Sequence, residues 1–553
     1  MNSFLKATQT QSGSAQTKNG AVSYASTGSE LVDQFGKAAS YIGRDISVVF
    51  DDQKRLWDEN PEAAIRFPFY LRLITRQSKI SRDKQFETEK VQRGAGVRDE
   101  AYKRLLWVAY NHPQRFYDNI WLLPFVGSWK DLWTIMFYDV EYGSSKLDRR
   151  AIYSVIADGL VNELTADLAK KYLPRIRSTK KCKTSWAQKS NELAKDFVAF
   201  LNSSLRDGFD YRDYRELKAE GGAHRFQQLI TAGKYDEINF KGIPGKALLN
   251  MATGKFLSNH GLSEKYTEWI KSQPVAKFNG YPYELGMKLK KPYGIFGYGV
   301  DRSSINITTK LTIDKQFESL IQTAKKDEGA IKGNVWCAID TSGSMCSAIS
   351  NKSKVTAYDV CASLGIFFST LNEGAFHKNV IMFDDTSRVL QLRGSFTEMW
   401  EQLPRDAMGS TNFQSVIDTI VRVRLENPSI PVSDYPSTLL VVSDMQFNPT
   451  KGYYGCDEKT NWEETKAKLK SVFPEEFANT FKVIWWNVNG RYGDDMPSTL
   501  DDAGTYFFSG FDGSVISFLL GGQPVQEGEK PNVPSMEEII DTALSQEIFS
   551  YLR

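Results

Sequence analysis

Hydrophobic residues recur at helical spacing along the first half of the chain. Residues 29–42, SELVDQFGKAASYI, place apolar side chains at three- and four-residue steps behind Ser29, a residue typical of a helix N-cap. Residues 99–140 have the pattern of consecutive helices, broken at His112-Pro113 and at Pro124. Many short amphipathic helices in series predict an α-helical repeat module over residues 26–300.

Short apolar runs alternate with amphipathic ones from residue 331 onward. The runs NVWCAID, NVIMFDD, STLLVVSDM, FKVIWWNVN and GTYFFSG have the length and composition of buried strands, and helical patterns lie between them. This alternation predicts an α/β domain over residues 331–553, with a parallel sheet covered by helices on both faces. Ligands of such sheets gather at the carboxyl ends of the strands.

The remaining segments are predicted from their composition. Residues 1–25 are rich in Ser, Thr, Gln and Gly and predict a flexible arm, and residues 301–330 predict a connection between the two modules. Residues 521–535 contain Gly, Pro and charge and predict an exposed connection. Residues 536–553 place apolar side chains on one helical face, so we expect this last helix to dock on the protein.

Composition narrows the class of protein. The chain has 553 residues, 41% of them hydrophobic and 25% charged, and a formal net charge of +2, which gives no global attraction to nucleic acid. Its five cysteines form no CxxC pair, which favours free thiols in a reducing compartment such as the cytoplasm. No run is long enough to cross a bilayer and no signal peptide is present, so no membrane partner is expected.

The octapeptide AIDTSGSM, residues 338–345, follows a strand pattern and carries the first candidate chemistry. Asp340, Ser342 and Ser344 put three small oxygen ligands on one turn, which Gly343 allows to fold tightly. Hard cations such as Mg²⁺ prefer oxygen ligands, whereas zinc favours His or Cys. A turn that caps its own backbone is the alternative, and for these three residues alone the two interpretations are balanced.

Two more loops favour the metal. Thr411 lies in MGSTNFQ just before a helical pattern, and Asp444 directly follows the strand pattern LLVVS. With Asp340, Ser342 and Ser344 they resemble the metal-ion-dependent adhesion site of von Willebrand factor A domains: DxSxS, a Thr from a second loop and an Asp from a third. The resemblance implies a site for Mg²⁺, or another hard cation such as Mn²⁺ or Ca²⁺. We expect the loop of residues 338–345 to be exposed and to pack little.

The same resemblance assigns a role to each ligand. Ser342, Ser344 and Thr411 would contact the ion directly, Asp340 and Asp444 would act mostly through water, and an open position would accept a carboxylate from a protein partner. No nucleophile–base pair accompanies the site, since the closest histidine in the sequence is His377, so we expect no enzyme. The acid pair Asp384-Asp385 is expected to be a solvated loop.

The first half carries a resemblance of its own. Residues 18–41, 123–135 and 239–251 resemble the TROVE module of the Ro autoantigen family, in which a ring of helical repeats precedes a von Willebrand A domain. This resemblance covers nearly the whole chain and implies binding of structured or single-stranded RNA. Within GSWKDL, residues 127–132, and the Trp133 that follows, the aromatic and leucine side chains are expected to pack, while Lys130 and Asp131 stay solvated.

Residues 170–190 are the candidate RNA-binding stretch, because they contain basic residues and no acid. Such a stretch can neutralise phosphates, and Tyr172 and Trp186 can stack on bases. A solvated basic loop is the alternative. The basic residues are Lys170, Lys171, Arg175, Arg177, Lys180, Lys181, Lys183 and Lys189.

Two functions from different classes therefore stay open. The first is a non-enzymatic RNA-binding ring protein whose A domain is a metal-dependent docking face, a ribonucleoprotein component in the cytoplasm. The second is a protein–protein assembly or structural component, such as one of a virus particle, that uses the same architecture as a scaffold. RNA binding with steep salt dependence would separate the first from the second.

Overall fold

The computed structural model describes residues 14–77, 91–142, 145–178, 180, 182–204, 206–222, 224–290, 305–351, 353–404, 407–450, 459–491, 495–520 and 534–553. The chain forms two compact units, each built from segments far apart in the sequence. The first contains residues 1–44 and 239–542, and the second contains residues 45–238 and 543–553. This division differs from the expected 26–300 and 331–553, because the helices at residues 245–253, 263–272 and 282–286 pack on the later helices at residues 307–328 and 357–371.

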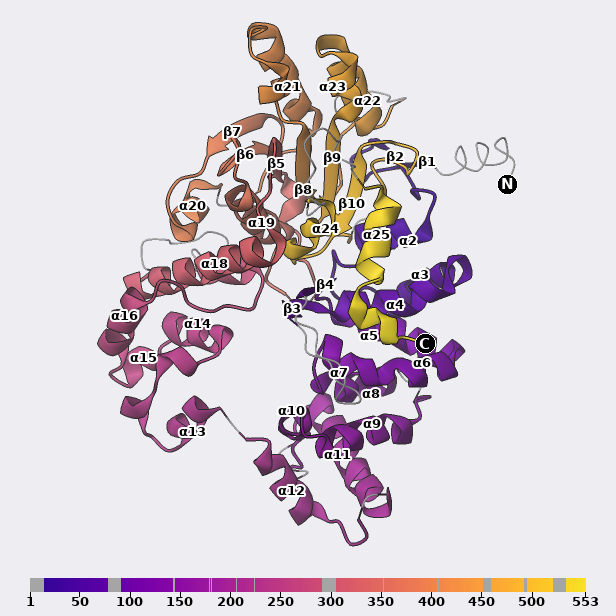
Figure 1. Cartoon of the computed structure of the whole chain (residues 1–553), viewed down its shortest axis with the longest axis vertical. Coiled ribbons are helices and arrows are strands. Elements are labelled where there is room, and N and C mark those ends of the chain that lie inside the picture. Colours follow the sequence, from indigo (N-terminus) through magenta and orange to yellow (C-terminus); the bar gives the residue numbers. More distant parts are fainter. Residues whose placement is uncertain are drawn as a thin grey trace. The chain divides into compact units, whose positions relative to one another are not determined.

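The second unit is mainly helical (Figure 1). Short antiparallel strands β3 (Ile74–Gln77) and β4 (Val91–Ala95) accompany the helices. The helices are α3 (Ile46–Glu59), α4 (Pro61–Arg72), α5 (Asp99–Asn111), α6 (Pro113–Asn119), η1 (Ile120–Leu122), α7 (Leu123–Val126), α8 (Lys130–Glu141), α9 (Arg149–Val161), α10 (Ala166–Tyr172), α11 (Ser185–Ser204), α12 (Tyr211–Glu220), α13 (Arg225–Thr231), η3 (Tyr235–Glu237) and η8 (Glu547–Tyr551).

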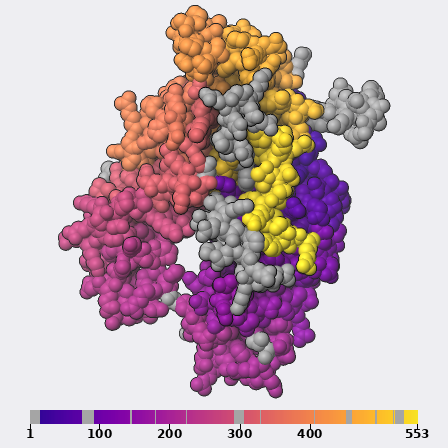
Figure 2. Space-filling view, in the orientation of Figure 1, coloured from indigo at the N-terminus to yellow at the C-terminus, as the bar shows by residue number. Residues whose placement is uncertain are grey.

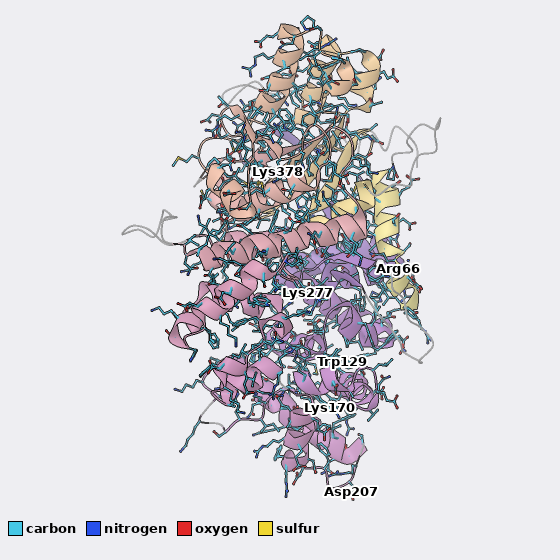
Figure 3. All side chains as sticks on the ribbon, turned by 60° about the vertical axis from the view of Figure 1, so that its left-hand side comes forward. Arg66, Trp129, Lys170, Asp207, Lys277 and Lys378 are labelled. Carbon is cyan, nitrogen blue, oxygen red and sulfur yellow. The ribbon has the colours of Figure 1, made fainter. Side chains whose placement is uncertain are left out.

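The start of α8 tests the expectation for GSWKDL. Trp129, labelled in Figure 3, is buried, and it packs so closely on Gly159 that a Cβ there would lie 2.0 Å from the indole ring. The expectation that Asp131 stays solvated is wrong, because its side chain is buried and accepts hydrogen bonds from Arg72 Nε at 2.7 Å and from the Tyr102 hydroxyl at 2.7 Å. A buried carboxylate is tolerated here because a guanidinium and a hydroxyl compensate it.

The end of the chain docks as expected. Asn119 Nδ2 donates to the backbone carbonyl of Arg553 at 2.7 Å, and Gln546 Nε2 donates to the carbonyl of Arg93 at 2.7 Å. Ile548 is fully buried. These last residues, yellow in Figure 2, therefore belong to the core of the helical unit although the preceding helix α25 (Met536–Leu544) begins in the other.

The first unit is built on a six-stranded sheet in the order β10-β9-β8-β5-β6-β7 (Figure 1). All neighbouring strands are parallel except β6 and β7, which are antiparallel. The sheet is therefore mixed, whereas the sequence predicted a parallel sheet. Strand β7 was not predicted because its side chains face solvent and lack an apolar run. The strands are β5 (Val335–Asp340), β6 (Asn379–Phe383), β7 (Ser387–Gln391), β8 (Thr438–Ser443), β9 (Lys482–Asn487) and β10 (Thr505–Ser509).

Helices pack on this sheet and extend the unit. Helix α19 lies on β5, where Gly365 lets it approach so closely that a Cβ would sit 2.4 Å from Ile339 Cδ1. The helices are α2 (Glu30–Lys37), η4 (Phe240–Gly242), α14 (Gly245–Thr253), α15 (Phe256–Asn259), α16 (Ser263–Ser272), α17 (Pro282–Gly286), α18 (Ile307–Glu328), η5 (Gly343–Cys346), α19 (Ala357–Leu371), α20 (Phe396–Gln402), α21 (Gln414–Glu426), η6 (Val432–Asp434), α22 (Asn461–Val472), α23 (Glu475–Thr480), η7 (Gly513–Ile516), α24 (Ser517–Leu520) and α25. The expected connection at 301–330 is thus mostly the long helix α18.

The N-terminal segment corrects another expectation. Residues predicted as part of a flexible arm form an antiparallel hairpin of β1 (Ser14–Gln16) and β2 (Val22–Tyr24). Tyr24 exchanges two backbone hydrogen bonds with Met496, of 2.9 and 2.8 Å. The partner lies more than 400 residues away, so local composition could not indicate this order.

Two general expectations can also be compared with the structure. Cys182, Cys337, Cys346 and Cys361 form no disulfide within the described residues, as expected, and Cys456 lies outside them. The expected connection at 521–535 lies mostly outside them too. Among the helices that the structure describes, none is long and apolar enough to cross a membrane.

Candidate functional site

The order of the strands brings the first and third candidate loops together. The chain runs outward from β5 to β6 on one side and from β8 to β9 and β10 on the other, so the connections diverge between β5 and β8. These two strands are parallel and pair in register through Ile339 and Val442. Asp340 ends β5 and Asp444 follows β8 at the same edge of the sheet. Ligands of open α/β sheets bind at such a divergence of connections.

Hydrogen bonds hold the candidate ligands of this edge in one cluster. The backbone N–H of Ser342 donates to Asp340 Oδ1 at 2.8 Å, and the Ser443 hydroxyl donates to Asp340 Oδ2. The hydroxyls of Ser342 and Ser344 lie 3.2 Å apart. Asp340 is thereby fixed on both oxygens, and the two serine hydroxyls stand next to it.

The carboxyl groups of the cluster are buried, whereas Gly343 at the tip of the first loop is exposed, so the expectation of an exposed loop holds only for that tip. Asp340 is 0% and Asp444 1% exposed, and Ser342 is buried as well. Burial raises the pKa of Asp340 to about 7, and the charge of Asp444 adds to the rise. Burial also raises the pKa of Asp444 to about 6, although a hydrogen bond from the Ser344 hydroxyl lowers it in part. Two acids that share a buried site oppose each other's ionisation, and a cation between them would reverse that effect.

The loop that carries Thr411 joins the first loop through the backbone. The N–H of Gly343 donates to the carbonyl of Gly409 at 2.9 Å, and Gly409 has a φ of +85°, which favours glycine. Asp385 accepts from the N–H of Ser410 at 2.9 Å and from its hydroxyl at 2.6 Å. These hydrogen bonds lower the pKa of Asp385. Asp385 therefore positions the loop before Thr411 instead of being only a solvated acid.

The N-terminal hairpin reaches this edge of the sheet. Asn19, in the turn of the hairpin, donates through Nδ2 to the carbonyl of Gln446 at 2.6 Å and to Thr411 Oγ1 at 3.3 Å. The backbone N–H of Lys18 donates to Gln446 Oε1 at 2.7 Å, and the Thr17 hydroxyl donates to the carbonyl of Phe447 at 2.7 Å. The hairpin thus covers the loops after β8 and before α21 and occupies a hydroxyl that the metal hypothesis assigns to the ion.

The donor set fits a hard cation better than a transition metal. Nowhere in the described residues do three or more His, Cys, Asp or Glu side chains gather as a metal site. The cluster instead combines two carboxylates with hydroxyls, which are the ligands that Mg²⁺ takes. Oδ2 of Asp444 is buried and has no hydrogen-bond partner within the described part of the chain. A buried carboxylate oxygen without a donor is costly, and a bound cation or its water would remove that cost.

The structure separates the predicted basic residues. Lys171, Arg175 and Arg177 line one cavity of the helical unit. Lys170, labelled in Figure 3, pairs with Glu220 at 2.7 Å, and Lys189 Nζ lies 5.2 Å from the centre of the Phe137 ring. Lys180 and Lys183 are exposed, and Lys181 lies outside the described residues.

Sequence reasoning missed several residues at both places. Ser443 could have been noticed as a hydroxyl beside Asp444 at the end of a strand pattern. Asn19 gave no signal, because it lies 392 positions before Thr411. In the helical unit, Lys130 and Lys218 line the same cavity as the predicted cations, although α8 and α12 lie outside the basic stretch.

Comparison with known families concerns the sheet-containing part of the chain. Residues 335–547 match the model of a family described as a domain of unknown function (DUF7788). The matched region begins at the first residue of β5 and contains Asp340, Ser342, Ser344, Thr411 and Asp444. No curated protein matches the chain.

Proposed function

We propose that the α/β domain is a non-enzymatic binding module that holds a divalent cation, Mg²⁺ or a similar hard ion, and uses it to bind an acidic group of a protein partner. The observation that carries this proposal is the pair of buried carboxylates between β5 and β8, where the connections diverge. One of them, Asp444, has an oxygen without a hydrogen-bond donor among the described residues. Following the resemblance to von Willebrand A domains, Ser342, Ser344 and Thr411 would contact the ion. Asp340 and Asp444 would hold its water shell.

The buried position of the cluster adds a condition to this function. Since Asn19 donates to Thr411 Oγ1, a partner carboxylate that completes the ion's shell would have to enter beside the hairpin or displace it. Hydrogen bonds tie the hairpin to the loops after β8 and before α21, and Asn19 contributes two of them. Partner binding at this site would therefore be weaker than the ligand set alone allows.

Calorimetric titration of Mg²⁺ and Mn²⁺ tests the cation site. We expect binding to the full chain at neutral pH, and loss of binding in Asp340→Ala and Asp340→Asn. Asp418→Asn is a matched control, because Asp418 is an exposed acid on α21 that pairs with Lys468. Equal metal binding by wild type and both Asp340 variants would reduce residues 338–345 to a self-capping turn.

RNA binding by the helical unit is a second candidate, and the cavity that gathers Lys171, Arg175 and Arg177 favours it. In this proposal the helical unit is the counterpart of the Ro-type repeat ring, and phosphates of RNA meet its exposed cations. The alternative is a scaffold within an assembly. Nucleic acid that co-purifies with the protein and dissociates steeply as salt rises would support RNA binding, whereas protein that never retains RNA at low salt would support the scaffold.

A further inference from the structure

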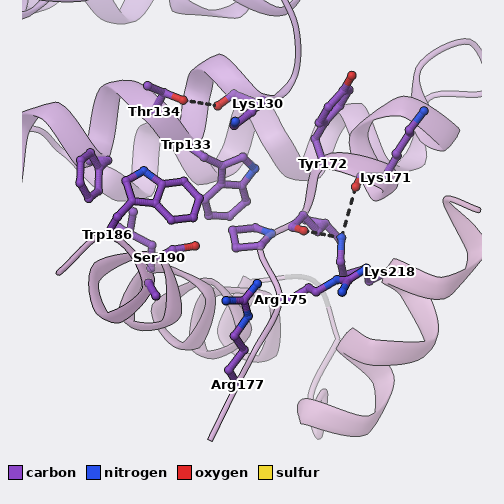
Figure 4. Close-up of a pocket in the computed structure, with 15 residues that line it drawn as sticks. Lys130, Trp133, Thr134, Lys171, Tyr172, Arg175, Arg177, Trp186, Ser190 and Lys218 are labelled. Carbon is purple, nitrogen blue, oxygen red and sulfur yellow. Dashed lines mark hydrogen bonds between the residues drawn. The ribbon is translucent and has the colours of Figure 1, made fainter. Parts of the chain in front are cut away.

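A cavity of about 250 Å³ opens within the helical unit. Five segments enclose it: α8, the end of α10, the connection that follows α10, α11 and α12. Figure 4 shows Trp133 and Trp186 on one side, Lys171 and Lys218 on the other, and Arg175 and Arg177 below. Its size approaches the lower end of the range for small-molecule sites, which is about 300–1,000 Å³.

One wall of the cavity is aromatic. Trp133 is buried and fixed by an edge-to-face contact with Phe197, with ring centres 5.3 Å apart. Trp186 lies 5.9 Å from Phe137, and it is 49% exposed. A half-exposed tryptophan beside a buried one offers a face on which a planar ring can stack at little cost in side-chain order.

The remaining lining is basic and contains no acid. Its cations come from three helices and one connection, and they are Lys130, Lys171, Arg175, Arg177 and Lys218. None of the five forms an ion pair with an acidic side chain in the described residues. Some basic groups near them do, as Lys170 pairs with Glu220 and Arg206 with Asp213. Repulsion among grouped cations stays uncompensated until an anion binds.

The backbone around the cations is held in place. The Tyr214 hydroxyl donates to the carbonyl of Pro174 at 2.7 Å, and the N–H of Arg177 donates to Asn191 Oδ1 at 2.8 Å. Lys218 Nζ donates to the carbonyls of Lys171, at 3.2 Å, and Leu173. These bonds fix the connection that carries Arg175 and Arg177, and neither guanidinium group pairs with a carboxylate in the part of the chain that the structure describes. The cavity is therefore preorganised for an anion.

We propose that this cavity binds a nucleoside phosphate, with the base against Trp133 and Trp186 and the phosphate at Arg175 and Arg177. An aromatic wall next to uncompensated cations matches a ligand that joins a planar ring to an anion, and guanidinium groups bind phosphate through paired hydrogen bonds. The inference deepens the proposed RNA binding, because the nucleotide could be free or part of a single strand.

Calorimetric titration of the full chain tests the proposal with four small probes: adenosine 5′-monophosphate, uridine 5′-monophosphate, adenosine and inorganic phosphate. We expect both nucleotides to bind at least tenfold more tightly than adenosine or phosphate, because each of these has only half of the recognised chemistry. Arg175→Gln combined with Arg177→Gln, and separately Trp186→Ala, should each weaken the nucleotides about tenfold or more.

A matched control keeps the test specific. Arg150→Gln combined with Arg215→Gln removes the same charge from exposed positions of α9 and α12 that do not line the cavity, and nucleotide binding should be unchanged. Inorganic phosphate that binds as tightly as the nucleotides would overturn the aromatic part of the site. Equal losses in the control and the cavity variants would overturn the cavity as the binding place.

A short single-stranded RNA, titrated at two salt concentrations, distinguishes the sources. RNA that competes with the mononucleotide and loses affinity in the cavity variants would place one of its nucleotides in this site. Mononucleotide binding without RNA binding would support a free nucleotide as ligand and would refute the proposed RNA function. RNA binding that ignores the cavity variants, without mononucleotide binding, would overturn this inference and leave RNA binding in place.

Discussion

Replacing Asp340 by Asn should stabilise the protein without metal and abolish its response to metal. The substitution keeps the shape of the side chain, and its amide can still accept from the N–H of Ser342 and face the Ser443 hydroxyl. The substitution removes a carboxyl group whose ionisation is unfavourable in the folded protein. Since a tenfold change in an acid constant corresponds to about 1.4 kcal/mol, a rise of the pKa from 3.8 to about 7 costs the ionised fold on the order of 4 kcal/mol.

The pH dependence follows from the direction of that shift. A carboxyl group whose pKa is raised in the folded state contributes stability at low pH, and this contribution is lost as pH rises from the unfolded value of 3.8 through about 7. Without divalent ions, wild type should therefore lose stability relative to Asp340→Asn as pH rises from about 4 to about 8. Mg²⁺ binds the ionised carboxylate, so it should restore the stability of the wild-type protein only at the upper end of this pH range.

Thermal unfolding in a chelator and in excess Mg²⁺, at about pH 5 and about pH 8, measures both effects. At about pH 8 in chelator we expect Asp340→Asn to melt several degrees above wild type, and we expect Mg²⁺ to raise the melting temperature of wild type alone. Asp418→Asn should behave as wild type because its charge is exposed. A variant that keeps the Mg²⁺ response, or that melts below wild type at every pH, would contradict the reasoning.

Three further outcomes are expected. Asn19→Ala should strengthen binding of an acidic partner, or of acetate as a carboxylate probe, several-fold in Mg²⁺, because the amide no longer occupies Thr411 Oγ1; unchanged affinity in a titration would show that the hairpin does not compete. Asp131→Asn should lower the free energy of unfolding by about 3–5 kcal/mol in denaturant titrations, since buried Arg72 loses its counter-charge. Asp196→Asn is the control for Asp131→Asn, because it breaks the exposed ion pair with Arg149. We expect it to change the free energy of unfolding by less than about 1 kcal/mol. Limited proteolysis should leave residues 543–553 on the folded protein, and their early removal would contradict their docking.

The fold was predictable where local pattern and burial agree. The apolar runs of β5, β8 and β9 are fully or almost fully buried. Each run is too short for a typical helix and is flanked by turns, so the sequence pattern predicts strands. Edge strand β7 was not predicted, because an exposed strand has no run of apolar residues by which to recognise it. Residues 14–24 were missed for another reason, because the hydrogen bonds that Thr17, Asn19 and Tyr24 make outside the hairpin go to residues 392 or more positions away.

The candidate metal site shows the same limit. Asp340, Ser342 and Asp444 could be proposed from spacing, because the carboxyl ends of parallel strands meet at one edge. Their burial could not be predicted, since it depends on the loops and the hairpin that cover them. The prediction that Asp131 stays solvated was wrong for a related reason. A Lys-Asp pair at the start of a helix is usually solvated, and only the position of Arg72 on α4 makes the buried carboxylate stable.

Net charge is a poor guide to the cavity of the helical unit. The chain has 69 Lys and Arg against 67 Asp and Glu, so its formal charge of +2 argues against a broad basic surface. A near balance, however, describes only the total, because ion pairing is local, as Lys170 pairs with Glu220 across 50 residues. The total therefore hides a local excess of cations at one cavity, whose lining contains no acid and where Arg175 and Arg177 lie beside two tryptophans. The local absence of compensation within these described residues, rather than the total charge, is what indicates an anionic ligand.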